Sequence, residues 1–288
     1  MLPETQKLLT TLETIVKNLT SGGSGIGSEG DHPFRPLIWS ISEQGEFSFV
    51  KLIEASRLLT EISLDELIEV WRNRFIRPGR YSEASSNRMI SQALPKYHSL
   101  IEILQTELEE LRFFKIQTYN EKSGKAGSDG FRGYDLLGLI VGQTTTGDWV
   151  AFTQKVELPD SAGFGERLPR YNYPVSEELS SLSEQIKPIL EDSASLIVFK
   201  ASLREDWAIE EVLRSIRFLE IYSFRGVFDV EQGAGYPYEY TNFEEFIATH
   251  LKDTRVYVLG NDALYRLYII GKCTTGDWLG ALTLAVWT

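Results

Sequence analysis

The sequence predicts a mixed α/β (α+β) protein with two tandem domains, each combining helices with a small, mainly antiparallel sheet. The main observation is a segment that occurs twice, as GQTTTGDW at 142–149 and as GKCTTGDW at 271–278. The two copies agree at six of eight positions and are offset by 271 − 142 = 129 residues. The length of 288 residues also fits two domains of the usual size of about 100–200 residues.

Both copies of this segment predict a β-hairpin. Four apolar runs flank them, at 136–141, 150–156, 267–270 and 279–286. Apolar runs joined by a short Thr/Gly/Asp cluster are typical of hairpins, because Gly147 and Gly276 can adopt a positive φ and the next residue can hydrogen-bond its own backbone. We therefore interpret Asp148 and Asp277 as turn-forming residues and not as catalytic ones.

The other elements of the first half follow from local patterns. Apolar residues at helical spacing predict helices over 4–19, 63–71 and 94–111, and a short apolar run predicts a strand over 37–41. Ser63 and Glu66 have the spacing of a capping box, which places the start of the second helix. The glycine-rich stretch 123–133 reads as a loop before the first hairpin.

The second half repeats this order of elements. Helices are predicted over 175–190, 209–219 and 243–251, and strands over 196–199 and 255–260. Between the halves, residues 159–174 contain three prolines and two glycines without any periodicity, which is typical of a linker. The predicted domains are therefore 1–158 and 175–288, joined by a linker at 159–174.

Composition and charge restrict the kind of partner. With 42% hydrophobic and 24% charged residues, the chain has the composition of an ordinary globular protein. Its net charge of −12 disfavours direct binding to nucleic acid and suits a basic protein partner. No apolar run reaches the roughly 20 residues that a membrane helix needs, and the N-terminus lacks an export signal. We therefore expect a cytoplasmic protein that does not bind membranes.

Catalytic and cofactor motifs are missing from the sequence. One cysteine, Cys273, and three histidines exclude an internal disulfide and disfavour a Cys/His metal site. Residues 25–30 fit G-x-G-x-x-G but follow a predicted helix and precede His32 and Pro33, so they do not form a dinucleotide site. The sequence therefore predicts a protein that is not an enzyme and has no cofactor.

Both halves of the chain resemble the nuclease A inhibitor family. In the second half, the resemblance lies in residues 251–260, in 267–271, in the Thr-Gly turn and in a final strand that ends at Thr288. In the first half, an opening helix is followed by SEGDHPF at 28–34, which is similar to the family segment S-E-x-x-x-P-F, and by the strand at 37–39. The resemblance thus covers nearly the whole chain as two divergent copies.

This resemblance implies both a fold and a function. The fold is a three-layer α-β-α sandwich in each copy, and the function is to block a metal-dependent, sugar-nonspecific DNA/RNA endonuclease. The family inserts acidic and C-terminal oxygen groups into the nuclease active site, and these groups correspond here to Glu29 and Thr288. Thr288 would meet a metal only through the Mg²⁺ of the nuclease, since Mg²⁺ prefers oxygen ligands. A further family contact, in a Pro-Gln-x-Trp loop, corresponds to 78–81, where Tyr81 takes the place of tryptophan.

The two inhibitory groups fall in different copies. Glu29 belongs to the first copy and Thr288 to the second, and the position equivalent to Thr288 in the first copy is 288 − 129 = 159, a proline. Neither copy alone holds both groups. Two functions therefore stay open: a nuclease inhibitor in which one copy suffices or both cooperate, and a duplicated non-catalytic interaction module that has lost nuclease binding.

Overall fold

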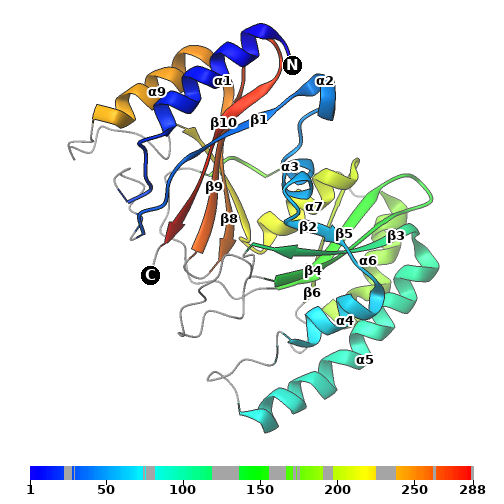
Figure 1. Cartoon of the computed structure of the whole chain (residues 1–288). Helices are drawn as coiled ribbons and strands as arrows, with labels where there is room; N and C mark the ends of the chain where they lie inside the picture. Colours follow the sequence, from blue (N-terminus) through cyan, green and yellow to red (C-terminus); the bar gives the residue numbers. More distant parts are fainter. Residues whose placement is uncertain are drawn as a thin grey trace. The chain divides into compact units, whose positions relative to one another are not determined.

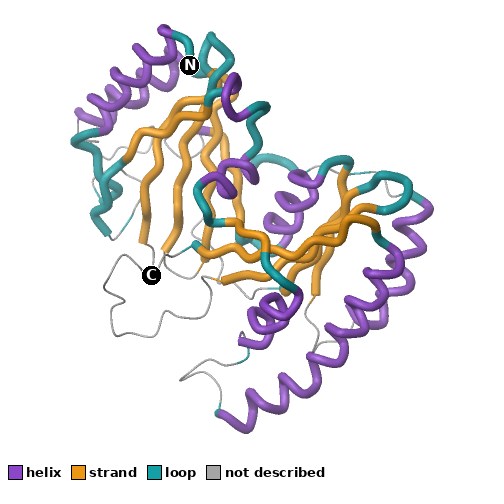
Figure 2. Tube along the Cα trace, turned by 45° about the vertical axis from the view of Figure 1, so that its right-hand side comes forward, coloured by secondary structure: helices purple, strands orange, loops and turns teal. Residues whose placement is uncertain are grey.

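A computed structural model gives the fold of the chain. It describes residues 1–22, 28, 30–73, 75, 82–118, 136–155, 167–170, 173, 176–190, 197–224, 238–261 and 264–286. These residues form helices and two five-stranded antiparallel sheets, which confirms the predicted α/β class with two sandwich-like units. The elements and their layers are shown in Figure 1, and the strands can be followed through each sheet in Figure 2.

The chain forms two compact units, and each draws on both halves of the sequence. Unit 1 comprises Met1–Ser48, Leu158–Pro169 and Leu219–Thr288, and unit 2 comprises Phe49–Glu157 and Arg170–Phe218. The units therefore do not coincide with the contiguous segments 1–158 and 175–288 that the sequence suggested.

The sheet of unit 1 has the strand order β1-β10-β9-β8-β7. Its strands are β1 (Arg35–Trp39), β7 (Leu219–Ser223), β8 (Lys252–Asn261), β9 (Leu264–Lys272) and β10 (Trp278–Val286). Helices α1 (Pro3–Val16) and α9 (Tyr238–His250) lie side by side on one face (Figure 1). Their apolar stripes, which include Leu12, Val16, Phe243 and Ile247, form a buried core with the strands beneath.

The other face of this sheet carries an aromatic cluster next to the short helix α2 (Ile41–Gln44). Phe47 stacks on Trp278 with a ring-centroid distance of 4.4 Å and meets Trp39 edge-on at 5.9 Å. Side chains alternate between the two faces of a strand, so each strand contributes to both layers. Unit 1 is therefore apolar on both faces of its sheet.

The sheet of unit 2 has the order β2-β3-β4-β5-β6. Its strands are β2 (Leu59–Glu61), β3 (Glu109–Gln117), β4 (Leu136–Gln143), β5 (Trp149–Gln154) and β6 (Ile197–Ser202). Its helices are α3 (Phe49–Ala55), α4 (Leu64–Asn73), α5 (Glu83–Glu107), α6 (Glu177–Leu190) and α7 (Glu205–Ser215). Helices α4, α5 and α6 share one core with Ile140, Val150 and Phe152, while α3 and α7 lie on the opposite face (Figure 1).

The local signals in the sequence are confirmed at the predicted places. The backbone N–H of Ser63 donates to Glu66 Oε2 (3.0 Å) and that of Glu66 donates to Ser63 Oγ (3.2 Å), which completes the capping box at the start of α4. Both predicted hairpins form, as β4–β5 and β9–β10. Gly147 and Gly276 have φ of 93° and 95°, as the turns require.

The contiguous domains are not observed because the edge strands pair with the opposite half. Strand β1 pairs with β10, which places Trp39 opposite Trp278, and β6 pairs with β5, which places Ser202 opposite Trp149. The opening helix and strand of each half thus complete the sheet of the other half. Part of the predicted linker is also built into unit 1, since the N–H of Leu168 donates to the carbonyl of Ile221 in β7 (2.8 Å).

Unusual backbone features recur at equivalent places in the two halves. Arg57 lies just before β2 and Arg217 lies just before β7. Their φ angles are 58° and 59°. Glu110 and Asp253, each in the bulge that begins the following strand, have φ of 48° and 50°. Positive φ is uncommon outside glycine, so its repetition at matched positions is what a duplication predicts.

Candidate functional site

The three residues expected to contact a partner, Glu29, Tyr81 and Thr288, lie outside the described residues. Their described neighbours locate the segments to which they belong. Ser28 and Gly30 flank Glu29, and β10 is described as far as Val286. These three neighbours belong to unit 1, whereas Ser82, next to Tyr81, belongs to unit 2.

The chain that follows α1 pairs in antiparallel fashion with the chain that precedes β1, with Thr20 opposite Pro33. The backbone N–H of Ser21 donates to the carbonyl of His32 (2.8 Å), and that of Phe34 donates to the carbonyl of Leu19 (3.0 Å). Ser21 Oγ also donates to the carbonyl of Gly30 (2.8 Å). Residues 30–34 are thereby fixed before β1 begins.

This segment runs along the C-terminal part of β10. Regular pairing between β1 and β10 extends to Arg35 opposite Leu282. Further along, Thr283 Oγ1 donates to the carbonyl of His32 (3.2 Å), and the backbone N–H of Val286 donates to Ser28 Oγ (3.1 Å). We call the surface formed by Ser28, Gly30, His32, Pro33, Thr283 and Val286 the terminal edge. It brings together the chain segments that contain Glu29 and precede Thr288.

The backbone at Gly30 packs closely against β10. A Cβ atom at this position would lie 3.1 Å from Val286 Cγ2 and 2.8 Å from His32 Nε2. The first neighbour belongs to β10 itself, so a larger residue would push the segment away from the strand. Ser28 is only 8% exposed, and its hydroxyl also donates to the carbonyl of Gly30 (2.8 Å).

Sequence reasoning missed Ser28, Gly30 and Val286 as parts of a site. The signal for Ser28 was present, because a small hydroxyl residue directly precedes the glutamate of the S-E-x-x-x-P-F segment. Its partner could not be found in the same way, since Val286 lies 258 residues further along the chain.

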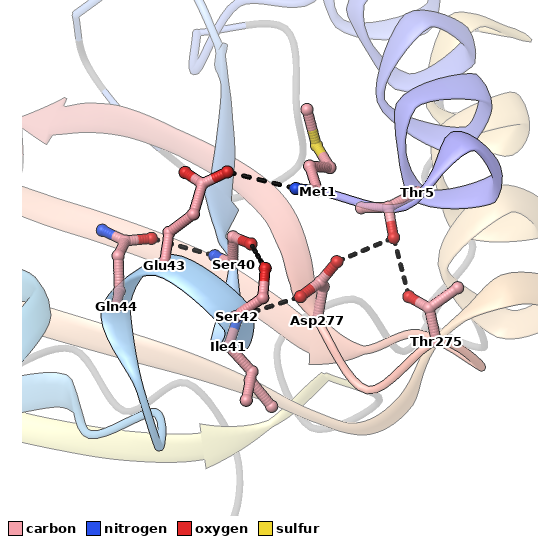
Figure 3. A network of polar contacts seen from close by, with 9 residues as sticks. All are labelled: Met1, Thr5, Ser40, Ile41, Ser42, Glu43, Gln44, Thr275 and Asp277. Atoms are coloured by element: carbon pink, nitrogen blue, oxygen red, sulfur yellow. Dashed lines mark hydrogen bonds and ion pairs between the residues drawn. The ribbon is translucent and has the colours of Figure 1, made fainter.

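The aspartate of the second hairpin has a structural role that differs from the expected one. Asp277 was expected to bond its own turn, but its Oδ2 accepts a hydrogen bond from Thr5 Oγ1 (2.8 Å) and its Oδ1 accepts one from the backbone N–H of Ile41 (2.9 Å). The carboxylate is 5% exposed and lies between α1 and the start of α2 (Figure 3). It therefore links two segments of the first half to β10.

The hairpin of unit 2 has a different set of partners. Asp148 Oδ1 accepts a hydrogen bond from the Tyr173 hydroxyl (2.9 Å). The Glu178 carboxylate accepts four hydrogen bonds, from the backbone N–H and hydroxyl groups of Thr145 and Thr146 (2.6–3.1 Å). These bonds, led by the one from the Thr146 hydroxyl, lower the pKa of Glu178. Each hairpin is thus hydrogen-bonded to the first turn of a helix from the other half of the sequence.

A cavity of about 150 Å³ in unit 2 has paired charges on its walls. Arg112 Nη1 contacts Glu205 Oε1 at 2.7 Å and Arg112 Nη2 contacts Glu61 Oε2 at 2.8 Å. Burial raises the pKa of Glu205, and the charge of Arg112 opposes this effect. Because Arg112 is paired with these two carboxylates, we interpret the cavity as structural.

The described residues form neither a metal-binding cluster nor a membrane-spanning helix. Over the part of the chain that the structure describes, no group of three or more His, Cys, Asp or Glu side chains is placed to hold a metal ion. Among the described helices, none combines the length and apolar character that crossing a membrane requires.

Comparison with known proteins finds a similarity in the first part of the chain. No curated protein matches the sequence. A family model described as nuclease A inhibitor-like protein matches residues 7–122, which include the segment 28–34 and extend from α1 to β3. Within the structure, the matched residues up to Ser48 belong to unit 1 and those from Phe49 belong to unit 2. The match supports the resemblance of the first half, since residues 7–122 are similar to the nuclease A inhibitor-like family.

Proposed function

We propose that the protein inhibits a metal-dependent, sugar-nonspecific DNA/RNA endonuclease by binding over its active site. The family match over residues 7–122 supports this class of function. The net charge of −12 also suits an enzyme whose active site is built to attract phosphate groups. In this proposal the chain is not itself an enzyme and needs no cofactor.

The hydrogen bond between Val286 N–H and Ser28 Oγ (3.1 Å) carries the proposal. Glu29 directly follows Ser28, and Thr288 lies two positions beyond Val286. We propose that these two residues act together from unit 1, although they belong to different halves of the sequence. The Glu29 carboxylate and the oxygen atoms of Thr288 would replace phosphate oxygens near the nuclease Mg²⁺, which accepts oxygen ligands almost exclusively.

The first half of the sequence has no equivalent of the terminal threonine. The position that corresponds to Thr288 is Pro159, and the chain continues beyond it. We therefore expect each chain to block one nuclease molecule through unit 1. Tyr81, whose neighbour Ser82 belongs to unit 2, is proposed as an additional partner contact.

Inhibition assays with nuclease A, the enzyme named in the family description, test this proposal. The enzyme is incubated with Mg²⁺ and plasmid DNA while the protein is titrated in, and the inhibition constant is measured. We expect the wild-type chain to inhibit and Glu29→Gln to weaken inhibition at least tenfold, which corresponds to about 1.4 kcal/mol. Thr288→Val should weaken inhibition independently of Glu29.

The matched control is Glu13→Gln, which removes the same charge from an exposed position of α1 in the same unit. It should leave the inhibition constant within about twofold, since long-range charge effects of single surface residues are small. A wild-type chain that does not inhibit nuclease A would argue against the proposal. Recovery of only non-nuclease proteins in a pull-down would then favour the alternative, a duplicated interaction module.

A further inference from the structure

We infer that Ser28 is a positioning residue for Glu29, because its hydroxyl bonds the chain next to Glu29 to the end of β10. This inference rests on the proposed function and adds the residue that unites its two contact segments. Ser28 itself is buried and would not touch the nuclease. Its effect on inhibition would therefore act through Glu29.

The geometry of the hydroxyl group supports this role. Ser28 Oγ accepts hydrogen bonds from the backbone N–H of Val286 (3.1 Å) and from that of Gly30 (3.2 Å), and it donates to the carbonyl of Gly30 (2.8 Å). One hydroxyl thus bonds the residue after Glu29 and the strand that leads to Thr288. A hydroxyl can offer one donor and two acceptor positions, so all of them are used here.

The bond from the Val286 N–H to Ser28 also affects where the Ser28 segment lies relative to β10. Val286 is at the outer edge of regular pairing in β10, where β1 no longer supplies a partner strand. Ser28 therefore supplies an acceptor to the backbone of β10 at the point from which the chain continues to Thr288. Without it, the segment around Glu29 could shift relative to β10, and a displacement of about 1 Å can be costly to a precisely placed contact.

A double-mutant cycle tests the inference. Inhibition constants for nuclease A are measured with wild type, Ser28→Ala, Glu29→Ala and the double variant. We expect Ser28→Ala to weaken inhibition at least tenfold and the double variant to match Glu29→Ala within about twofold. A positioning residue has no further effect once the group it positions is gone, so the two effects should not multiply.

Three further measurements separate positioning from loss of stability. Ser28→Thr, which keeps the hydroxyl, should restore most of the inhibition. Ser63→Ala removes a hydroxyl that accepts a bond from the Glu66 N–H (3.2 Å) at the start of α4, and it should lower the melting temperature comparably without changing the inhibition constant. Amide hydrogen exchange at Val286 should become faster in Ser28→Ala only.

The outcomes distinguish this inference from the proposed function. If wild type inhibits and Ser28→Ala inhibits equally well, or if the effects of Ser28→Ala and Glu29→Ala multiply, the positioning role is wrong and the proposed function stands. If wild type does not inhibit at all, the proposed function is overturned and the positioning role with it. Gly30→Ala provides an independent check, because its Cβ would press on Val286 and should also weaken inhibition.

Discussion

The two copies of the Thr-Thr-Gly-Asp-Trp segment form the same backbone turn but hold different polar networks. In unit 2, Thr144 N–H donates to the Asp148 carbonyl at 2.8 Å, and in unit 1, Cys273 N–H donates to the Asp277 carbonyl at 2.9 Å. The side chains differ, since Asp277 binds Thr5 and Ile41 whereas Asp148 binds Tyr173. Local sequence therefore determines the turn, and the segment that packs against it determines the partners of the side chains.

Both networks nevertheless connect opposite halves of the sequence. Thr5 of α1 reaches the hairpin of the second half, and Glu178 of α6 reaches the hairpin of the first half. Helix α1 and β1 thus belong with β7–β10, while α6 and β6 belong with β2–β5. Within one chain, this arrangement resembles the exchange of identical elements between protomers in domain-swapped dimers.

Cutting the chain between its halves is the strongest test of whether each half completes the sheet of the other. A protease site inserted within residues 159–166 would yield two pieces, each containing parts of both units. We expect the pieces to stay associated and to elute together at the mass of the intact chain, 32.7 kDa. Separation would require the loss of both the β1–β10 ladder, with five residue pairs, and the β5–β6 ladder, with six.

The uncut insertion variant is the control for this experiment, and denaturant should separate the cut pieces. Contiguous domains would behave differently, since the pieces 1–158 and 175–288 would come apart under native conditions and each would melt cooperatively. That result would contradict the exchanged arrangement.

Replacing the two turn aspartates should give the next largest difference. Asp277→Ala removes the acceptor of one buried and one partly buried hydrogen bond, and we expect it to lower the free energy of unfolding by about 3 kcal/mol. Asp148→Ala removes one bond to Tyr173 and should cost about 1.5 kcal/mol. Urea unfolding curves measure both values.

Asparagine variants provide the control for these two replacements. Asp277→Asn keeps an acceptor for the Ile41 N–H but places an amide, which cannot accept, near Thr5, so we expect roughly half of the alanine effect. Equal losses for Asp277→Ala and Asp148→Ala would mean that both residues act only as turn formers, as the sequence alone suggested.

Elements with local causes were predictable from the sequence. The capping box of Ser63 and Glu66 and the positive φ of Gly147 and Gly276 each depend on a few neighbouring residues. Helix α5 shows the limit of such patterns, because it begins at Glu83 after the Ser82 cap whereas the apolar spacing suggested a start at 94. Pro95 lies inside this helix and does not end it.

The pairing of the edge strands could not be predicted. Periodicity states which side of a strand is apolar, but it does not select between two sheets whose hairpins have nearly the same sequence. The Trp of each segment copy faces an edge strand of the other half, Trp278 opposite Trp39 and Trp149 opposite Ser202. For the same reason, the sequence placed Glu29 and Thr288 in separate domains, while the structure places Ser28 beside Val286.

The smallest expected effect concerns the acid dependence of the Glu178 contact. Hydrogen bonds from Thr146 and Thr145 lower the pKa of Glu178 in the folded protein. A carboxylate with a lowered folded pKa stabilises the protein above its unfolded pKa, about 4.3, and loses this effect as the pH falls through the folded value. Glu178→Gln should therefore reduce stability at pH 7, by less than about 1 kcal/mol because solvent screens the contact, and the difference from wild type should vanish at a second, acidic pH that lies below the folded pKa. Glu177→Gln, at the neighbouring exposed position of the same first turn of α6, controls for the helix dipole. Urea midpoints at both pH values measure the effect, and an equal, pH-independent loss in both variants would show that the threonine contacts of Glu178 contribute nothing of their own.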